Sequence, residues 1–88
     1  MAVGLNVAMT VDDPWGGVIV SAQNAHLAAG TPTSLLTGVT DFGRWTRPAV
    51  AQSTSRADTG IIRLGTEAGL GIQVDAPALG APVIDVSI

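Results

Sequence analysis

The chain has 88 residues, of which 47% are hydrophobic and only 12% are charged, and it has a net charge of −3 and no cysteine. This length leaves room for a single domain, and the lack of cysteine excludes disulfide bonds and thiolate metal sites. All four cations are arginines and form no basic patch, which excludes duplex nucleic-acid binding by phosphate neutralisation. Arginine without lysine is typical of protein interfaces, although a GC-rich genome produces the same bias.

The first predicted element is a strand at residues 2–11, where bulky apolar side chains alternate with small ones. Residues 12–17 interrupt it with an Asp-Asp-Pro sequence and paired glycines, which are typical of a turn. A run of three β-branched residues then indicates a second strand over residues 17–22, so the two strands are predicted to form a hairpin. Trp15 at its tip either folds back over the hairpin or serves as an exposed anchor for a partner.

The middle of the chain has weaker patterns. Residues 22–29 fit one short helix, capped by Ser21 and ended by Gly30 in the left-handed conformation, although an irregular loop fits the same stretch. Residues 34–39 are predicted to form a strand or a turn. Residues 51–60 are polar and lack any bulky apolar side chain, which predicts an exposed loop.

An aromatic and cationic cluster lies between these segments. Phe42, Arg44, Trp45 and Arg47 fall within six residues of one another. Arginine side chains at such spacing can stack on an aromatic face. An ordinary strand end, with Trp45 turned inward and both arginines turned outward, accounts for the pattern equally well.

The last third of the chain returns to a β pattern. Short strands are predicted at residues 61–64 and 70–74, and a final strand at residues 83–88. Between them, residues 75–82 contain two prolines, which a central strand does not accommodate, so this segment is predicted to be an extended arm. The two terminal strands either pair within the chain or add to the sheet of a neighbour.

These elements predict one mainly β domain over residues 1–88, with the Pro-bearing arm at residues 75–82. Its expected architecture is a small antiparallel β-barrel or sandwich with long loops, with room for one short helix near residues 22–29.

No motif for catalysis or metal binding is found. His26 is the only histidine, and it has no cysteine or conspicuous carboxylate near it in the sequence. Asp12, Asp13 and Asp41 are of the type that binds Ca²⁺, but their spacing is not that of an EF-hand. The glycines at positions 65, 69 and 71 do not form a phosphate-binding loop. We therefore predict no enzymatic activity, no catalytic residue, no metal site and no cofactor.

In overall character the chain resembles the small head-decoration proteins of tailed bacteriophages, which are charge-poor β domains with an apolar closing strand like residues 81–88. The resemblance implies oligomers seated on a major capsid protein, with extended arms making the contacts. A tail or head–tail connector subunit fits nearly as well. We therefore predict a structural subunit of a larger assembly, most simply a virion protein, whose partners are copies of itself and a larger structural protein such as a major capsid protein. The residues predicted to form its interface are Trp15, Arg44, Trp45, Arg47, Val83, Ile84, Val86 and Ile88.

The alternative function is a small ligand-binding module of the carbohydrate-binding or adhesin type, with Trp15 and Trp45 as its platform. An aromatic content of 3% is low for such a platform. The chain has neither a charged signal-peptide start nor an apolar run that is long enough to span a membrane. The predicted location is the virion after synthesis in the host cytoplasm, with no contact to membrane or nucleic acid.

Overall fold

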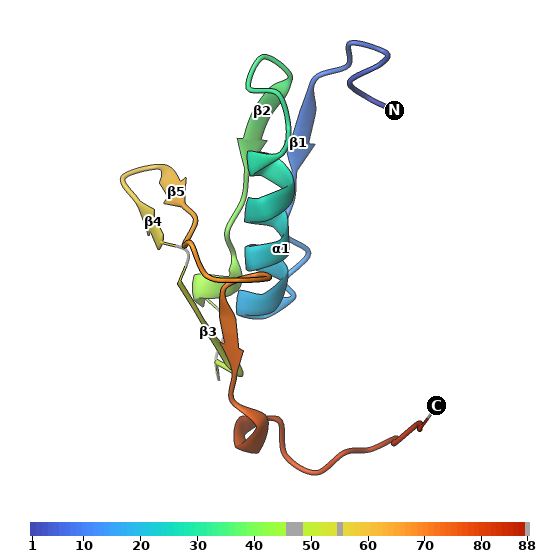
Figure 1. Ribbon diagram of the computed structural model, residues 1–88, viewed down its shortest axis with the longest axis vertical. Helices are drawn as coiled ribbons and strands as arrows, with labels where there is room; N and C mark the ends of the chain where they lie inside the picture. The colour runs from blue at the N-terminus through green and yellow to red at the C-terminus, as the bar shows by residue number, and fades with distance from the viewer. Residues whose placement is uncertain (46–48, 55, 88) are drawn as a thin grey trace.

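The computed structural model describes residues 1–45, 49–54 and 56–87. Figure 1 shows their arrangement. The elements of the described residues are mostly short strands, together with one α-helix and two short 3₁₀ helices. In chain order these elements are β1 (Met9–Val11), α1 (Gly17–Ala29), β2 (Leu36–Val39), η1 (Gly43–Trp45), β3 (Ala51–Ser53), β4 (Arg56–Asp58), β5 (Ile61–Arg63), β6 (Ile72–Val74) and η2 (Ala76–Leu79).

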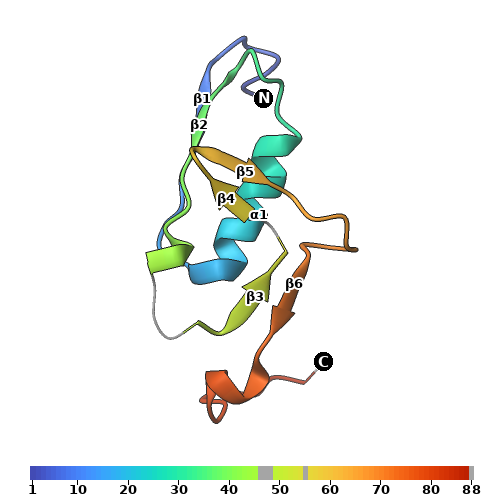
Figure 2. The same cartoon turned by 90° about the vertical axis from the view of Figure 1, so that its left-hand side faces the viewer.

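The N-terminal part is a β-α-β unit. Strands β1 and β2 are parallel, with Met9 opposite Leu36 and Val11 opposite Val39, and α1 is the crossover between them. Parallel neighbours require such a crossover, because a tight turn joins only antiparallel strands. Both strands run along one side of α1 (Figure 2). The predicted N-terminal hairpin is therefore wrong.

Helix α1 occupies the segment that was predicted to be the second strand. The helix predicted near residues 22–29 is present, but it begins earlier, at Gly17. Alanine is the strongest helix former, and its recurrence in the second half of α1 outweighs the β-branched run in the first turn. Ser21 lies within the helix and is not its cap. Gly30 follows the helix in a right-handed conformation, with φ −82° and ψ −3°, and is not the predicted left-handed terminator.

The core consists of small side chains. Ala22, Ala25 and Ala28 lie three positions apart on one face of α1 and are only 2–6% exposed. The remaining buried hydrophobic residues in the described part of the chain are Val11 of β1 and Ala51 of β3. An alanine face allows the backbone of the helix to approach the strands closely, but it buries little apolar surface.

The other strands form two antiparallel pairs. Strand β3 pairs with β6, and β4 pairs with β5 through a tight turn in which Thr59 and Gly60 both have positive φ. The predicted exposed loop at residues 51–60 is therefore wrong, and its first residue, Ala51, is only 3% exposed. The strands predicted at residues 34–39, 61–64 and 70–74 are confirmed as β2, β5 and β6.

Both predicted terminal strands differ in the structure. Only the end of the first is a strand, because residues 2–6 form turns closed by backbone hydrogen bonds such as Leu5 N–H to the carbonyl of Ala2 (3.2 Å). Residues 83–87 are not a strand, since they have no neighbour with which to pair, and Ile88 lies outside the described residues. The segment predicted to be an extended arm contains η2, which Asp75 caps by accepting a hydrogen bond from Ala78 N–H (3.4 Å).

The described strands form three separate two-stranded sheets and no closed barrel. The radius of gyration is 15.0 Å, whereas a compact domain of this length has about 12 Å. The accessible surface is 6582 Å², whereas a compact protein of this mass exposes about 4,800 Å². The segment after η2 extends away from the rest of the molecule (Figure 1). Much apolar surface is thus uncovered within this chain.

Candidate functional site

The candidate site lies where β1 and β2 end. Because the two strands are parallel, the loops that follow them meet at the same edge of the sheet. In open parallel sheets and in α/β-barrels, ligands bind at this carboxyl edge. We call the residues that meet there the strand-end site: Asp12, Asp13 and Trp15 after β1, and Thr40, Phe42 and Trp45 after β2.

Asp13 is the buried centre of the strand-end site, with 2% of its surface exposed. Its Oδ1 accepts a hydrogen bond from Trp15 N–H (2.9 Å). Its Oδ2 accepts hydrogen bonds from the Ser21 hydroxyl (2.5 Å), Phe42 N–H (3.0 Å) and Gly43 N–H (3.2 Å). Burial by itself raises the pKa of Asp13, but the bonds from Ser21 and from backbone N–H groups outweigh it, so the pKa is below its ordinary value. The carboxylate is therefore ionised at neutral pH.

Asp12 and Thr40 join the two strand ends at the surface. The Thr40 hydroxyl donates to Asp12 Oδ1 (2.7 Å) and accepts from Asp13 N–H (2.7 Å). The Asp12 carbonyl accepts a hydrogen bond from the Asn24 side chain of α1 (3.0 Å). Unlike Asp13, Asp12 is exposed, so its carboxylate is accessible to a ligand.

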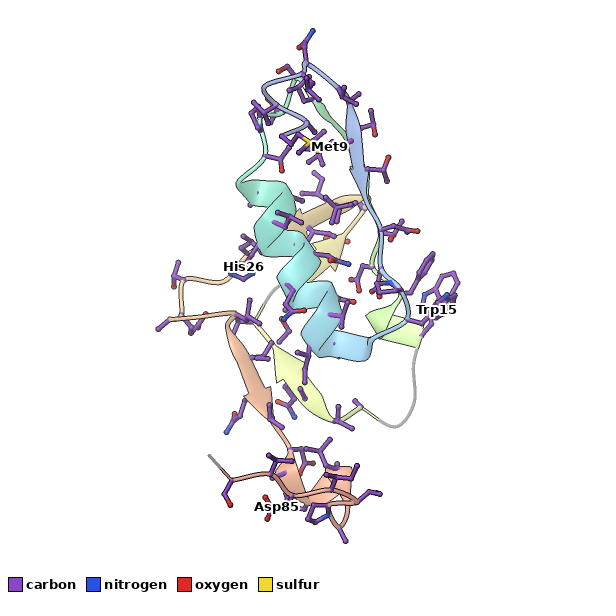
Figure 3. All side chains as sticks on the ribbon, turned by 90° about the vertical axis from the view of Figure 1, so that its right-hand side faces the viewer. Met9, Trp15, His26 and Asp85 are labelled. Atoms are coloured by element: carbon purple, nitrogen blue, oxygen red, sulfur yellow. The ribbon has the colours of Figure 1, made fainter. Side chains whose placement is uncertain are left out.

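The three aromatic residues of the chain gather beside these carboxylates. Trp15 stacks on Phe42, with ring centroids 4.5 Å apart and planes 10° from parallel. Trp45 lies tilted against both, at 6.5 Å from Trp15 and 5.9 Å from Phe42. Trp15 and Trp45 remain 57% and 73% exposed. Figure 3 shows Trp15 on the opposite side of α1 from His26. Exposed aromatic faces beside carboxylates suit a small organic cation or an apolar ring.

The loop that carries Trp15 has an unusual backbone. Trp15 has φ 66° and Gly17 has φ 71°. Glycine accepts this left-handed region at little cost, but a bulky residue occupies it only where its surroundings hold it there. Such conformations gather at functional sites. The backbone of Trp15 is therefore held in this region by its surroundings, which include the bond from its N–H to Asp13 Oδ1.

A cleft of about 400 Å³ lies beside the strand-end site, between α1, η1 and β3. Its walls include Val18, Ala22, Asp41, Gly43 and Gln52. Ser21 and Gly43 border both this cleft and the Asp13 carboxylate.

The structure brings together some of the predicted interface residues. Trp15 and Trp45 lie in one cluster, and Arg44 is the middle residue of η1. Arg47 lies outside the described residues, so a stack of its side chain on an aromatic ring stays a prediction. Val83, Ile84 and Val86 are 97%, 81% and 78% exposed, on the segment that leads away from the site. Their role as an interface stays a prediction.

Sequence reasoning names Asp13 only as a residue of the type that binds Ca²⁺ and misses its role in joining the two strand ends. The Asp-Asp-Pro-Trp-Gly-Gly sequence is typical of a turn, which needs no further role for its carboxylates. A strand followed by acidic and aromatic residues and then by an alanine-rich helix was the available signal for a strand-end site.

The described residues contain no group of three or more histidine, cysteine or acidic residues placed to hold a metal ion. They also contain no helix that is long and apolar enough to cross a membrane.

Comparison with known proteins shows similarity to enzymes along nearly the whole chain. No protein-family model matches. The chain is 34% identical over 83 residues to a cis-3-hydroxy-L-proline dehydratase of Roseibium aggregatum, a match that covers 94% of this chain and 23% of the dehydratase. A crystal structure of a mandelate racemase/muconate lactonizing enzyme from Roseovarius nubinhibens matches 99% of this chain with a TM-score of 0.87 and 31% identity. A magnesium complex of a putative enzyme of the same description and organism matches with a TM-score of 0.88 and 32% identity. The chain spans about a quarter of the length of these relatives.

These similarities overturn the predicted function. The predictions of a non-catalytic virion protein related to head-decoration proteins and of a carbohydrate-binding or adhesin module are wrong, because the proteins that match the chain are enzymes. The virion location has no support either. The absence of a catalytic set was weak ground for excluding an enzyme, because a chain that matches a quarter of an enzyme need not contain the base or the metal ligands.

Proposed function

We propose that the chain is a segment of an enzyme of the enolase superfamily and supplies one wall of its active site. The observation that carries this proposal is the similarity to a dehydratase over 94% of the chain, at 34% identity. The superfamily acts on carbon acids, and the relatives are named as a dehydratase, a racemase and a lactonizing enzyme.

The β-α-β unit supports a place within a larger parallel sheet. Parallel sheets occur almost only where helices cover both faces of the sheet. Strands β1 and β2 form a parallel sheet of two strands, with α1 on one side (Figure 2). We infer that they belong to a larger sheet. Continued by further strands, the sheet would have its ligand site at the carboxyl edge, where Asp12, Trp15 and Phe42 already lie. The finer architecture that we propose is thus a part of an α/β sheet or barrel.

The strand-end site suits a substrate that contains an ammonium group and an apolar ring. The substrate named for the dehydratase is a cyclic amino acid with both features. An aromatic face attracts a cation by about 0.5–2 kcal/mol, and the exposed Asp12 carboxylate adds charge attraction. We propose that Trp15, Trp45 and Asp12 bind the ring and the ammonium group.

The chemical step needs groups from outside this chain. Dehydration takes a proton from the carbon that bears the carboxylate, while the hydroxyl of the neighbouring carbon leaves with a proton as water. Enzymes of this superfamily use a lysine or histidine base and stabilise the developing charge with Mg²⁺. This chain has no lysine, and His26 Nδ1 contacts the Ala22 carbonyl within α1 (2.8 Å). The described residues also do not fit a complete metal site. This chain therefore binds and orients the substrate.

Co-expression tests the proposal. The chain is produced together with the Roseibium aggregatum dehydratase from which the 83 matching residues have been removed, and the two are purified as a complex. We expect the complex to dehydrate cis-3-hydroxy-L-proline or to exchange its α-proton with deuterated water. Neither part alone should do so. A stable complex that performs neither reaction on this or on related cyclic amino acids would contradict the proposed function.

A further inference from the structure

We propose that Asp13 is a positioning residue, which holds the aromatic wall formed by Trp15, Phe42 and Trp45 by binding the loops after β1 and β2 at the same time. Its effect on an enzymatic reaction rests on the proposed function, but its effect on the aromatic wall does not.

The bonding partners of Asp13 come from three separate segments. Trp15 belongs to the loop after β1, Ser21 belongs to α1, and Phe42 and Gly43 follow β2. Gly43 lies 30 positions from Asp13 in the sequence. One carboxylate thus joins the segments from which the stacked rings project, and the two ring-bearing residues, Trp15 and Phe42, both donate their backbone N–H groups to it.

The chemistry of the group matters as much as its place. A carboxylate accepts hydrogen bonds at both oxygens and donates none, and here its Oδ2 accepts three. An asparagine of the same shape would replace one of the two acceptor oxygens with an NH₂ donor. That NH₂ group would face N–H or O–H donors and could not accept their hydrogen bonds. Asp13 is also almost fully buried, so water cannot replace the lost acceptor.

The strained backbone of Trp15 also supports a positioning role for Asp13. At φ 66° a tryptophan does not stay without support. The bond from its own N–H to Asp13 Oδ1 supplies that support at 2.9 Å. Without it the loop would relax toward negative φ, and the Trp15 ring would leave the face of Phe42.

The test is spectroscopic and uses the whole chain, at a temperature and concentration at which the wild-type far-ultraviolet signal shows α1 folded. Stacked and tilted rings give a near-ultraviolet circular dichroism signal that is lost when the rings move freely. We expect Asp13→Asn to reduce this signal at least about twofold, while the far-ultraviolet signal of α1 is kept. Asp85→Asn is the matched control, because Asp85 is exposed and lies at the lower end of the molecule in Figure 3, away from Trp15. A folded Asp13→Asn chain with the full near-ultraviolet signal overturns the proposal.

A second variant decides the case in which Asp13→Asn does not fold. Ser21→Ala leaves the carboxylate and its bond to Trp15 in place, but it removes one donor to Oδ2 and one of the acceptors of Gly43 N–H (3.1 Å), which also donates to Asp13. We expect a smaller loss of the same near-ultraviolet signal with α1 kept. An unchanged signal in that variant overturns the proposal.

The co-expressed complex adds a kinetic measurement. A displaced aromatic wall weakens substrate binding, so Asp13→Asn should raise KM about tenfold and change kcat less than about twofold. A loss confined to kcat contradicts a positioning role. If the wild-type complex is inactive, the proposed function fails while the spectroscopic result still decides the role of Asp13.

Discussion

At the scale of single residues, the buried charge of Asp13 determines how the strand-end site is built. A buried carboxylate is costly unless it is fully hydrogen-bonded, and Asp13 meets this condition with four donors. It links segments that contribute few large side chains to the core. The stability of this region should therefore depend on whether the Asp13 carboxyl group is ionised.

The first prediction concerns acid. The pKa of Asp13 in the folded chain is below its ordinary value, so its stabilising effect is complete above the unfolded pKa of about 3.9 and is lost as the pH falls through the lower, folded pKa. We expect the free energy of unfolding, measured by urea titration, to fall in this acid range. The Asp13→Asn chain should be less stable at neutral pH and less sensitive to acid, whereas Asp85→Asn should behave as wild type. Equal acid sensitivity in all three would show that other carboxylates are responsible.

The second prediction concerns the close approach of η1 to α1. A Cβ on Gly43 would collide with the Ser21 hydroxyl and lie 2.9 Å from the backbone of Gly17. We expect Gly43→Ala to cost about 1–3 kcal/mol of stability, as measured by chemical denaturation. A Cβ on Gly38 would meet no atom within 4 Å, so Gly38→Ala is the control. Similar stability of the two variants would show that the approach is not tight.

At the scale of elements, α1 packs through a face made of alanine. Ala22 and Ala25 are buried, and the helix contacts β1, β2, β3 and η1. Small side chains set these distances, so additional volume on this face should separate the helix from the strands.

The third prediction tests that packing. Ala25→Leu adds three carbons at a position that is 6% exposed, and we expect it to destabilise the chain by about 1–3 kcal/mol. Ala29→Leu, at an exposed position of the same helix, should change stability by less than about 0.5 kcal/mol. Thermal unfolding followed at the helical signal distinguishes the two. A tolerated Ala25→Leu would indicate that the alanine face has room to spare.

The elements also show which features the sequence allows one to predict. Strands β2, β5 and β6 were predictable because each is a short segment with two large aliphatic residues. Helix α1 was mistaken for a strand in its first turn, because Val18, Ile19 and Val20 favour β structure locally while the alanines that follow decide the outcome. Parallel pairing was not visible, since it joins residues that are distant in sequence. Trp15 and Trp45 were identified as functional candidates, but their meeting with Phe42 depends on that pairing. Alternation at residues 83–87 did not produce a strand, because alternation without a neighbouring strand does not form a sheet.

At the scale of the whole molecule, the chain has more surface than its core can stabilise. Its exposed apolar side chains include Leu5, Leu27, Ile61, Val83 and Ile84. The chain matches about a quarter of larger enzymes. Such exposed apolar side chains are expected if the remaining three quarters of an enzyme of this kind cover them.

The fourth prediction follows from this surface. We expect the isolated chain to unfold at low temperature or to self-associate, as seen by calorimetry and light scattering. Addition of the complementary part of the dehydratase should raise the unfolding temperature with increasing concentration, since a partner that binds only the folded state stabilises it. An isolated chain that is monomeric and stable, and that is unaffected by the complement, would argue against this.

A chimeric enzyme tests the central claim most directly. The 83 matching residues of the Roseibium aggregatum dehydratase are replaced by the corresponding residues of this chain within one polypeptide, and the dehydration of cis-3-hydroxy-L-proline is measured. The account predicts a folded enzyme with measurable turnover. It also predicts that Trp15→Ala raises the KM of this enzyme for the substrate. A chimera that folds with wild-type stability but neither dehydrates this substrate nor exchanges its α-proton would contradict the account.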